Sequence, residues 1–338
     1  MEQTRFPDTI DHTLKSRMGE QAYKRALEQQ QIISEEHYAV IRGLAEFSVR
    51  PPFRTPVHKL PSEHGMNTWE DIFFQSADGV PLEGWYIPAV MGESDKLIII
   101  NHPFPFSRSG LVGHFGEPFS AVDDLEVDFV AHMSHLSKAG YNIIAYDLRN
   151  HGNSGTANNN ICGIGRYEWR DCVGVKQYVD NHPKYSKMKV ALYSRCTGGN
   201  AQIEAIYRCP ELFENVVCFF GPMTIEMDAC MQTFANLSGV GQYFDLMTYE
   251  QVKLGGFTSE EMTPIPFSSA VKMPYFISQV KNDSWTDNPA SGQRLFDAIG
   301  SEEKELFWIE GTTRRFDAYN YFGIYPERMV GFFDRYMK

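Results

Sequence analysis

The sequence predicts an α/β fold built on a mostly parallel sheet with helices on both of its faces. Two observations predict it: short, mostly apolar runs alternate with stretches of helical periodicity, and the runs are apolar enough for strands buried on both faces. Strands that alternate with helices are typical of βαβ units and a parallel sheet. The expected strands lie at residues 96–101, 141–147, 189–194, 215–221, 274–280 and 305–311.

An N-terminal helical arm is expected before the sheet, and we assign residues 1–65 to it. Residues 15–48 have apolar positions at helical spacing, with no proline and only two glycines, which predicts one or two helices. RPPFRTP at residues 50–56 then ends the helical pattern. The arm either covers a pocket or pairs subunits in a homodimer, and the sequence does not decide between the two.

The sheet is expected to begin with an antiparallel hairpin. WEDIFFQSADGVPLEGWYIPAV, at residues 69–90, alternates apolar and polar positions around an Asp-Gly turn. The core is then assigned to residues 66–221 and 269–338. Between them, residues 222–268 form a connection too long for an ordinary loop, and we expect a lid rich in methionine and aromatic residues. The core helices are expected at residues 127–138, 166–181, 197–208, 288–299 and 326–337.

The composition argues against nucleic-acid and membrane partners. The formal net charge is −12, whereas nucleic acids and anionic membranes bind clustered Lys and Arg. The N-terminus is polar, and no segment has the roughly 18–20 apolar residues that cross a bilayer, so we expect a cytoplasmic protein. The six cysteines include no C-x-x-C pair, which favours reduced thiols over disulfides or zinc. We expect neither a metal nor another cofactor.

A candidate nucleophile lies in ALYSRCTGGNAQ, at residues 191–202. A strand is expected to end here, a tight turn carries Cys196, and two glycines open the next helix. Small residues at these positions let the helix pack against the strand while the turn exposes the nucleophile. Over roughly residues 70–338 the chain resembles the α/β-hydrolase superfamily, in particular its dienelactone-hydrolase-like and acyl-peptidase-like members. The resemblance implies an α/β-hydrolase fold, with Cys196 where a serine is usual.

Two further segments carry the resemblance. AYDLRNHGNSG, at residues 145–155, is similar to the Asp-x-Arg-x-His-Gly-x-Ser turn of the superfamily, whose role is mostly structural. QVKNDSWTDN, at residues 279–288, ends an expected strand and has Asp283 where the family has the acid of its catalytic triad. The alternative for Asp283 is a turn residue at the start of a helix.

An oxyanion hole is implied by NHPFPFS, at residues 101–107, which follows the first parallel strand. Family members have an oxyanion-hole amide there, and Pro103 stands where glycine is common. Because proline has no N–H group, the resemblance points to the amide of Phe104 as one donor and that of Thr197 as the second.

The chain departs from the family at IEGTTRRFDAYNYF, residues 309–322. Family members have a histidine before the apolar-Asp-x-Tyr sequence, and the alignment puts Arg315 in its place, or Arg314 if the register slips by one. No histidine follows His182. The triad histidine is therefore absent.

A cysteine tolerates the loss of this base better than a serine. A serine hydroxyl barely ionises, whereas a few per cent of an ordinary thiol is thiolate at pH 7. The start of the helix at Thr197, together with Arg315 or Arg195, would favour the anion of Cys196. His102, beside the expected oxyanion donors, is a candidate replacement base. The alternative is that Cys196 is a small buried residue at an inactive turn.

These residues predict an enzyme that attacks an ester, lactone or thioester through Cys196. Without the histidine the acyl-thioester would persist, which favours acyl transfer, or slow hydrolysis through water and Asp283 or His102. The lid residues indicate a small, mostly apolar acyl substrate. Two alternatives stay open: a non-catalytic small-ligand-binding protein whose arginines meet a carboxylate, and proton abstraction or carbon–carbon cleavage with Asp283 as general base.

Overall fold

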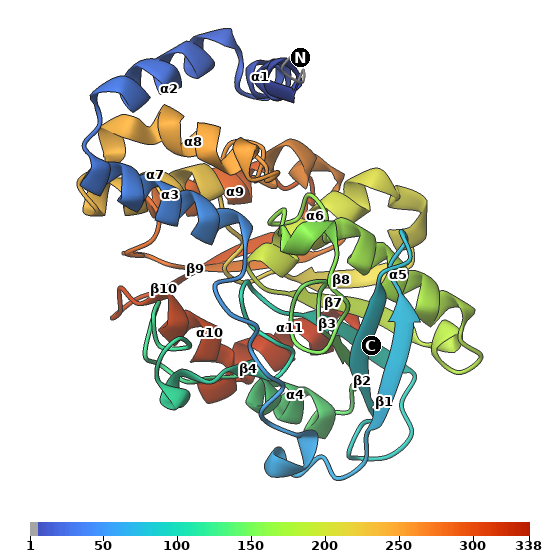
Figure 1. Cartoon of the computed structure of the whole chain (residues 1–338). Helices are drawn as coiled ribbons and strands as arrows, with labels where there is room; N and C mark the ends of the chain where they lie inside the picture. The colour runs from blue at the N-terminus through green and yellow to red at the C-terminus, as the bar shows by residue number, and fades with distance from the viewer. Residues whose placement is uncertain (1–5) are drawn as a thin grey trace.

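An eight-stranded sheet forms the centre of the computed structural model, which describes residues 6–338. Its strand order is β1-β2-β6-β3-β7-β8-β9-β10 (Figure 1), and the strands from β6 to β10 run parallel. The mostly parallel sheet is confirmed. The strands are β1 (Glu70–Gln75), β2 (Pro81–Ile87), β3 (Lys96–Asn101), β6 (Asn142–Tyr146), β7 (Lys189–Ser194), β8 (Val216–Phe220), β9 (Tyr275–Val280) and β10 (Lys304–Ile309).

Helices cover both faces of the sheet because neighbouring strand residues point to opposite sides. In β3, Ile98 and Ile100 belong to one core and Leu97 and Ile99 to the other. The first core is closed by α4 (Phe129–Lys138), α10 (Arg315–Ile324) and α11 (Glu327–Tyr336), and the second by α5 (Trp169–Asn181), α6 (Thr197–Arg208) and α9 (Ala290–Ala298). The prediction of helices on both faces is therefore confirmed.

The hairpin expected at residues 69–90 is formed by β1 and β2, which pair antiparallel from Glu70 opposite Tyr86 to Gln75 opposite Pro81. A second sheet, made of β4 (Gly110–Leu111) and β5 (Val127–Asp128), was not predicted because each of its strands has only two residues. The 3-10 helices are η1 (Pro61–His64), η2 (Gly113–Phe115), η3 (Asn158–Asn160), η4 (Tyr185–Lys187), η5 (Pro210–Phe213), η6 (Gly241–Tyr243) and η7 (Ile265–Ala270).

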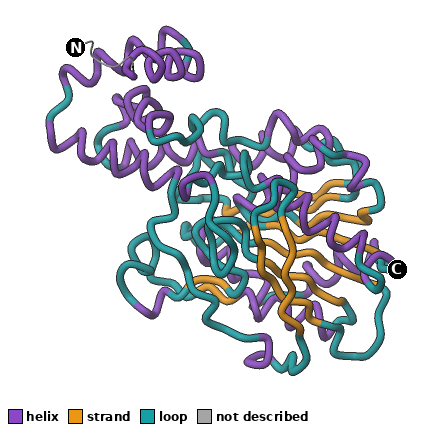
Figure 2. The backbone as a smooth tube through the Cα atoms, turned by 45° about the vertical axis from the view of Figure 1, so that its right-hand side comes forward, coloured by secondary structure: helices purple, strands orange, loops and turns teal. Residues whose placement is uncertain are grey.

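The N-terminal arm consists of three helices, α1 (Phe6–Met18), α2 (Glu20–Ile32) and α3 (Glu35–Val49), where the sequence predicted one or two. The breaks have local causes. Gly19 has a φ of 80°, which favours glycine, and the Ser34 side chain accepts a hydrogen bond from the amide of His37 to start α3. In Figure 2 the helices that follow the N label lie at one end of the molecule, away from the strands.

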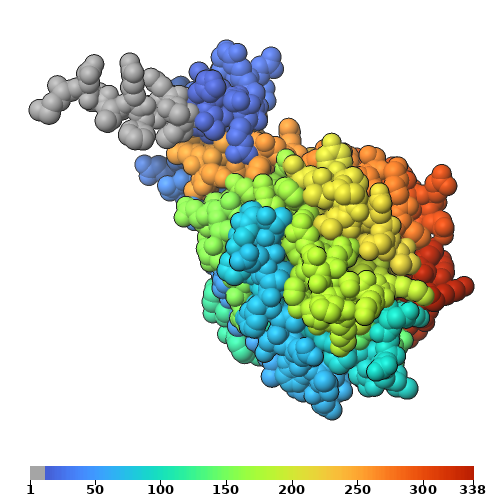
Figure 3. Space-filling view, turned by 90° about the vertical axis from the view of Figure 1, so that its right-hand side faces the viewer, coloured from blue at the N-terminus to red at the C-terminus, as the bar shows by residue number. Residues whose placement is uncertain are grey.

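The arm packs on the segment expected as a lid. Residues 222–268, called the cap segment from here on, contain α7 (Met227–Leu237) and α8 (Phe244–Lys253). Leu14 and Tyr23 of the arm form a buried cluster with Val252 of α8, and Arg25 donates to Asp245 at 2.6 Å. In Figure 3 the dark blue beginning of the arm stands out from the rounded body, next to the orange region that includes α8. Between residues 6 and 338, no helix combines the length and apolarity that a membrane crossing requires.

Candidate active site

Cys196 lies on a tight turn between a strand and a helix. Strand β7 ends at Ser194, α6 begins at Thr197, and Cys196 between them has φ 49° and ψ −118°. A positive φ is uncommon for a residue with a side chain and is often kept at functional sites. Position 198 requires glycine for a steric reason: a Cβ atom there would lie only 2.3 Å from Oδ1 of Asn101. The local sequence thus allows the strand, turn and helix to pack closely around the sulfur.

Arg315 is the charged group that reaches Cys196. Its Nη2 lies 3.9 Å from Sγ of Cys196 and donates to the carbonyl of Met223, while its Nη1 donates to Oδ2 of Asp283. Cys196 is 3% exposed and Arg315 is 1% exposed. Burial by itself lowers the pKa of Arg315, but the charges of Tyr319, Asp283 and Cys196 outweigh burial and raise it above its usual value. The guanidinium therefore stays charged beside the sulfur.

Asp283 faces Arg315 from the loop after β9. Its Oδ1 accepts the amide of Trp285 at 3.0 Å, and its Oδ2 accepts from Arg315 and from the hydroxyl of Thr286. The structure thus brings together three of the residues picked from the sequence, Cys196, Asp283 and Arg315. Arg314, the other register, lies on the surface and pairs with Asp123 and Asp124.

Tyr319 is a member of this group that sequence reasoning missed. It lies one turn after Arg315 on α10 and is 2% exposed, and its hydroxyl accepts from Nε of Arg315 at 3.1 Å and interacts with the Cys196 thiol. Burial and the nearby Cys196 raise the pKa of Tyr319, and Arg315 only partly offsets them. The spacing of four residues from Arg315 was the available signal, once a helix at that place is known.

Phe104 and Thr197, whose amides are the expected oxyanion donors, contact each other, and only one of the two amides already donates a hydrogen bond. The amide of Phe104 donates to Oγ1 of Thr197 at 2.8 Å, so the threonine hydroxyl occupies this donor. The amide of Thr197, at the start of α6, has no acceptor among residues 6–338.

His102 is held by backbone groups on both sides of its ring. Nδ1 pairs with the carbonyl of Pro103 at 2.9 Å, and Nε2 accepts the amide of Leu148 at 3.0 Å. Burial lowers the pKa of His102 to about 4. Neither nitrogen is left to accept a proton from Cys196, so the geometry does not favour His102 as the base.

Arg195 is the second arginine that the sequence offered as a partner for the thiolate. Its guanidinium is buried between the rings of Tyr193 and Phe129, 3.7 Å and 4.2 Å from their centres, and Nη1 reaches the carbonyl of Asn101 at 3.5 Å. Burial lowers the pKa of Arg195. Arg315, which contacts the sulfur, is therefore the better placed of the two arginines.

Aromatic rings from four segments form a chain of contacts that leads to Arg315. Phe47 of α3 contacts Phe104 and Phe234, with ring centres 6.0 Å and 6.2 Å apart, and Phe234 of α7 contacts Trp285 at 5.2 Å. These four rings are half-buried, and we call them the aromatic rim. Trp285 also lies 5.9 Å from the guanidinium of Arg315. The arm and the cap segment thus both contribute rings to a cluster that reaches Arg315.

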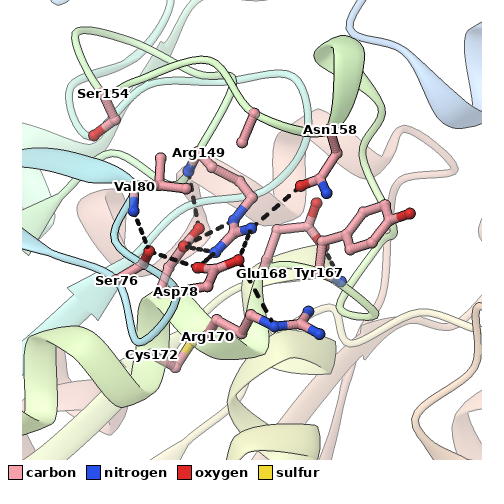
Figure 4. Close-up of polar contacts among 12 residues, drawn as sticks. Ser76, Asp78, Val80, Arg149, Ser154, Asn158, Tyr167, Glu168, Arg170 and Cys172 are labelled. Atoms are coloured by element: carbon pink, nitrogen blue, oxygen red, sulfur yellow. Dashed lines mark hydrogen bonds and ion pairs between the residues drawn. The ribbon is translucent and has the colours of Figure 1, made fainter.

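The turn at residues 145–155 has a structural role. Figure 4 shows Arg149 between Asp78 and Asn158, and its guanidinium also donates twice to Asp171 at 2.9 Å and 2.7 Å. Burial raises the pKa of Asp171 to about 6, although Arg149 opposes this shift.

Within the described part of the chain, no three His, Cys, Asp or Glu side chains are placed to hold a metal ion.

Comparisons with solved structures identify the fold. The chain is similar to the esterase Pf2001 from Pyrococcus furiosus, with 19% identity, a TM-score of 0.60, and coverage of 85% of this chain and 100% of that one. It is also similar to the α/β hydrolase GrgF from Penicillium sp. sh18, with 15% identity, a TM-score of 0.56, and coverage of 80% and 99%. The acylaminoacyl peptidase of Pyrococcus horikoshii matches at 14% identity with a TM-score of 0.53, over 80% of this chain and 42% of that one.

No protein-family model matches the sequence, and no curated protein does. The structural likeness shows that the chain has an α/β-hydrolase fold, as its motifs predicted. At these identities the likeness concerns the fold alone.

Proposed function

We propose that the protein is an enzyme that attacks an activated carbonyl compound, an ester, lactone or thioester, through Cys196. The observation that carries the proposal is the contact between the Cys196 sulfur and the guanidinium of Arg315, which Asp283 holds in place. A cation this close to a buried sulfur stabilises its thiolate, which is the nucleophilic form. The names of the structural neighbours, esterase and peptidase, agree with chemistry at a carbonyl carbon.

The proposed first step forms a thioester. The sulfur of Cys196 attacks the carbonyl carbon, and the negative charge that develops on the oxygen is stabilised by the amides of Thr197 and Phe104. Collapse of this intermediate expels the leaving group and leaves the acyl group on Cys196. An acyl acceptor such as water, an alcohol, a thiol or an amine then takes the acyl group in a second step.

The proposed substrate is a small molecule with a mostly apolar acyl part. The aromatic rim presents four half-buried rings, one of which lies 5.9 Å from the guanidinium of Arg315, and such surfaces bind flat or apolar groups by burying their area. Asp283 is less suited to act as a general base on carbon, because both of its oxygens already accept hydrogen bonds.

Intact-mass spectrometry with p-nitrophenyl acetate tests the proposal. We expect the wild-type protein to gain one acetyl group that maps to Cys196, and to release one equivalent of p-nitrophenolate in a burst. Cys196→Ala should lose both signals. Cys196→Ser should lose them too, because a serine hydroxyl barely ionises and the neighbouring Arg315 cannot accept its proton.

Cys209→Ala is the matched control, since Cys209 is the one cysteine of the six that is not buried and is the first expected target of non-specific acylation. This variant should keep the adduct and the burst. A wild-type protein without an adduct, or an adduct that follows Cys209 instead of Cys196, would contradict the proposal and favour a non-catalytic binding protein.

A further inference from the structure

A cysteine that exchanges acyl groups needs a nearby side chain that donates and accepts protons, and the structure argues against three of the candidates. The leaving group must gain a proton in acylation, and the acceptor must lose one in deacylation. Arg315 cannot supply this function because a guanidinium does not deprotonate in proteins. Both nitrogens of His102 bind the backbone, and Asp283 is engaged by Arg315 and by the amide of Trp285.

Tyr319 is a further titratable side chain beside the sulfur. Its oxygen accepts a hydrogen bond from Nε of Arg315 at 3.1 Å, which leaves its own proton free to point elsewhere, and the hydroxyl interacts with Cys196. Both residues are buried, at 2% and 3% exposure, so water does not compete strongly for that proton.

We propose that Tyr319 is the catalytic acid and base of the Cys196 site. The inference rests on the acyl chemistry proposed above. In acylation the bond between the carbonyl carbon and the leaving atom breaks, the electron pair stays with the leaving atom, and that atom takes the phenolic proton of Tyr319. The phenolate formed pairs with the guanidinium of Arg315. In deacylation the acceptor passes its proton to this phenolate while it attacks the thioester, and the carbon–sulfur bond breaks to restore the Cys196 thiolate.

The charges of the site favour this order of events. The thiolate of Cys196 opposes a second negative charge on Tyr319, and acylation removes the thiolate. Once the sulfur is acylated, the phenolate faces the positive charge of Arg315 without that repulsion. The phenol therefore becomes a better acid when the leaving group needs its proton.

Leaving-group dependence in Tyr319→Phe tests the inference. The variant keeps the ring and its packing and removes the hydroxyl. Acylation by p-nitrophenyl acetate should change less than about threefold, since p-nitrophenolate leaves as an anion without a proton. Acylation by an ethyl ester of the same acid should fall by about 100-fold or more, because ethoxide is a poor leaving group without one. Tyr321→Phe, on the same helix, should leave both rates unchanged.

Equal losses with the two esters would overturn the inference and show a structural role for Tyr319, and so would no loss with either. A wild-type protein that forms no adduct with p-nitrophenyl acetate would instead overturn the proposed function, so the two failures are distinguishable. Should Tyr319→Phe fail to fold, the wild-type protein provides a second test. A solvent deuterium isotope effect on acylation by the ethyl ester that is absent with the p-nitrophenyl ester is expected, and equal effects would contradict the inference.

Discussion

At the scale of single residues, the candidate site pairs a cysteine with an arginine. Cys196 lies on the turn where the resemblance led us to expect a nucleophile, and Arg315, expected in the place of the histidine, faces Asp283. An arginine would not activate a serine, since it cannot accept the hydroxyl proton, but beside a cysteine it stabilises the thiolate. The carboxylate of Asp283 holds the guanidinium at its distance of 3.9 Å from the sulfur.

The Arg315 and Asp283 pair should be coupled in stability. Both side chains are fully buried, so Arg315→Met should leave an unpaired carboxylate inside the protein and lower the free energy of unfolding by about 3–5 kcal/mol. Asp283→Asn should also destabilise. The double variant should lose clearly less than the sum of the two, because neither charge is then left alone. Urea denaturation of all four proteins measures this, and additive losses would show that the ion pair is not a unit.

At the scale of helices and strands, the sequence predicted most of the core and less of the site. Strands β3 and β6–β10 are short apolar runs and could be located by composition alone. Helix α10 was missed, because it begins with polar residues and buries residues on several sides, Arg315 and Phe316 among them, so it shows no one-sided apolar pattern.

Candidate site residues divide in the same way. Cys196 and Asp283 were found because each stands at the end of a recognisable strand. Tyr319 reaches Arg315 only because both lie on α10. His102 is unable to accept a proton because its Nε2 binds the amide of Leu148, which is distant in sequence. Contacts of this kind are set by tertiary packing, and no local pattern contains them.

The third helix of the arm should control access to the sulfur. Phe47 is the ring that connects Phe104 with Phe234 across the aromatic rim. Phe47→Ala should therefore open the rim and increase the rate of iodoacetamide alkylation at Cys196, which mass spectrometry can follow. Ile32→Ala is a suitable control, because Ile32 lies on the same arm with 74% of its surface exposed. An unchanged rate in Phe47→Ala would show that the rim is not the route to the thiol.

At the scale of the whole molecule, buried titratable groups set the response to acid. Burial lowers the pKa of His102 to about 4 and also lowers that of His151. Below about pH 6.5 these histidines become protonated in the unfolded chain, whereas in the folded protein they stay neutral until a lower pH. The histidines therefore contribute stability that is complete above pH 6.5 and is lost as the pH falls. Asp171 has the opposite effect: it increases the free energy of unfolding as the pH falls from its raised pKa of about 6 to its ordinary value of 3.8.

The free energy of unfolding should accordingly fall between pH 6.5 and pH 4. His102 alone accounts for a loss on the order of 3 kcal/mol in that interval, and with His151 it outweighs Asp171. Urea denaturation at several pH values measures the slope. In His102→Gln the slope should be smaller, even though the variant is less stable at every pH. A stability that stays constant or rises on acidification would contradict the assignment.

The packing of the arm on α8 has a consequence for biosynthesis. Arg25 and Gln29 bind Asp245 and Leu246, which are more than 200 residues further along the chain. The arm leaves the ribosome before α8, and at about 5–20 residues per second this partner helix follows on the order of ten to forty seconds later. During that interval the apolar faces of the arm have no native surface to cover them. A nascent chain of this protein is thus expected to depend on chaperone shielding of the arm helices until α8 is translated.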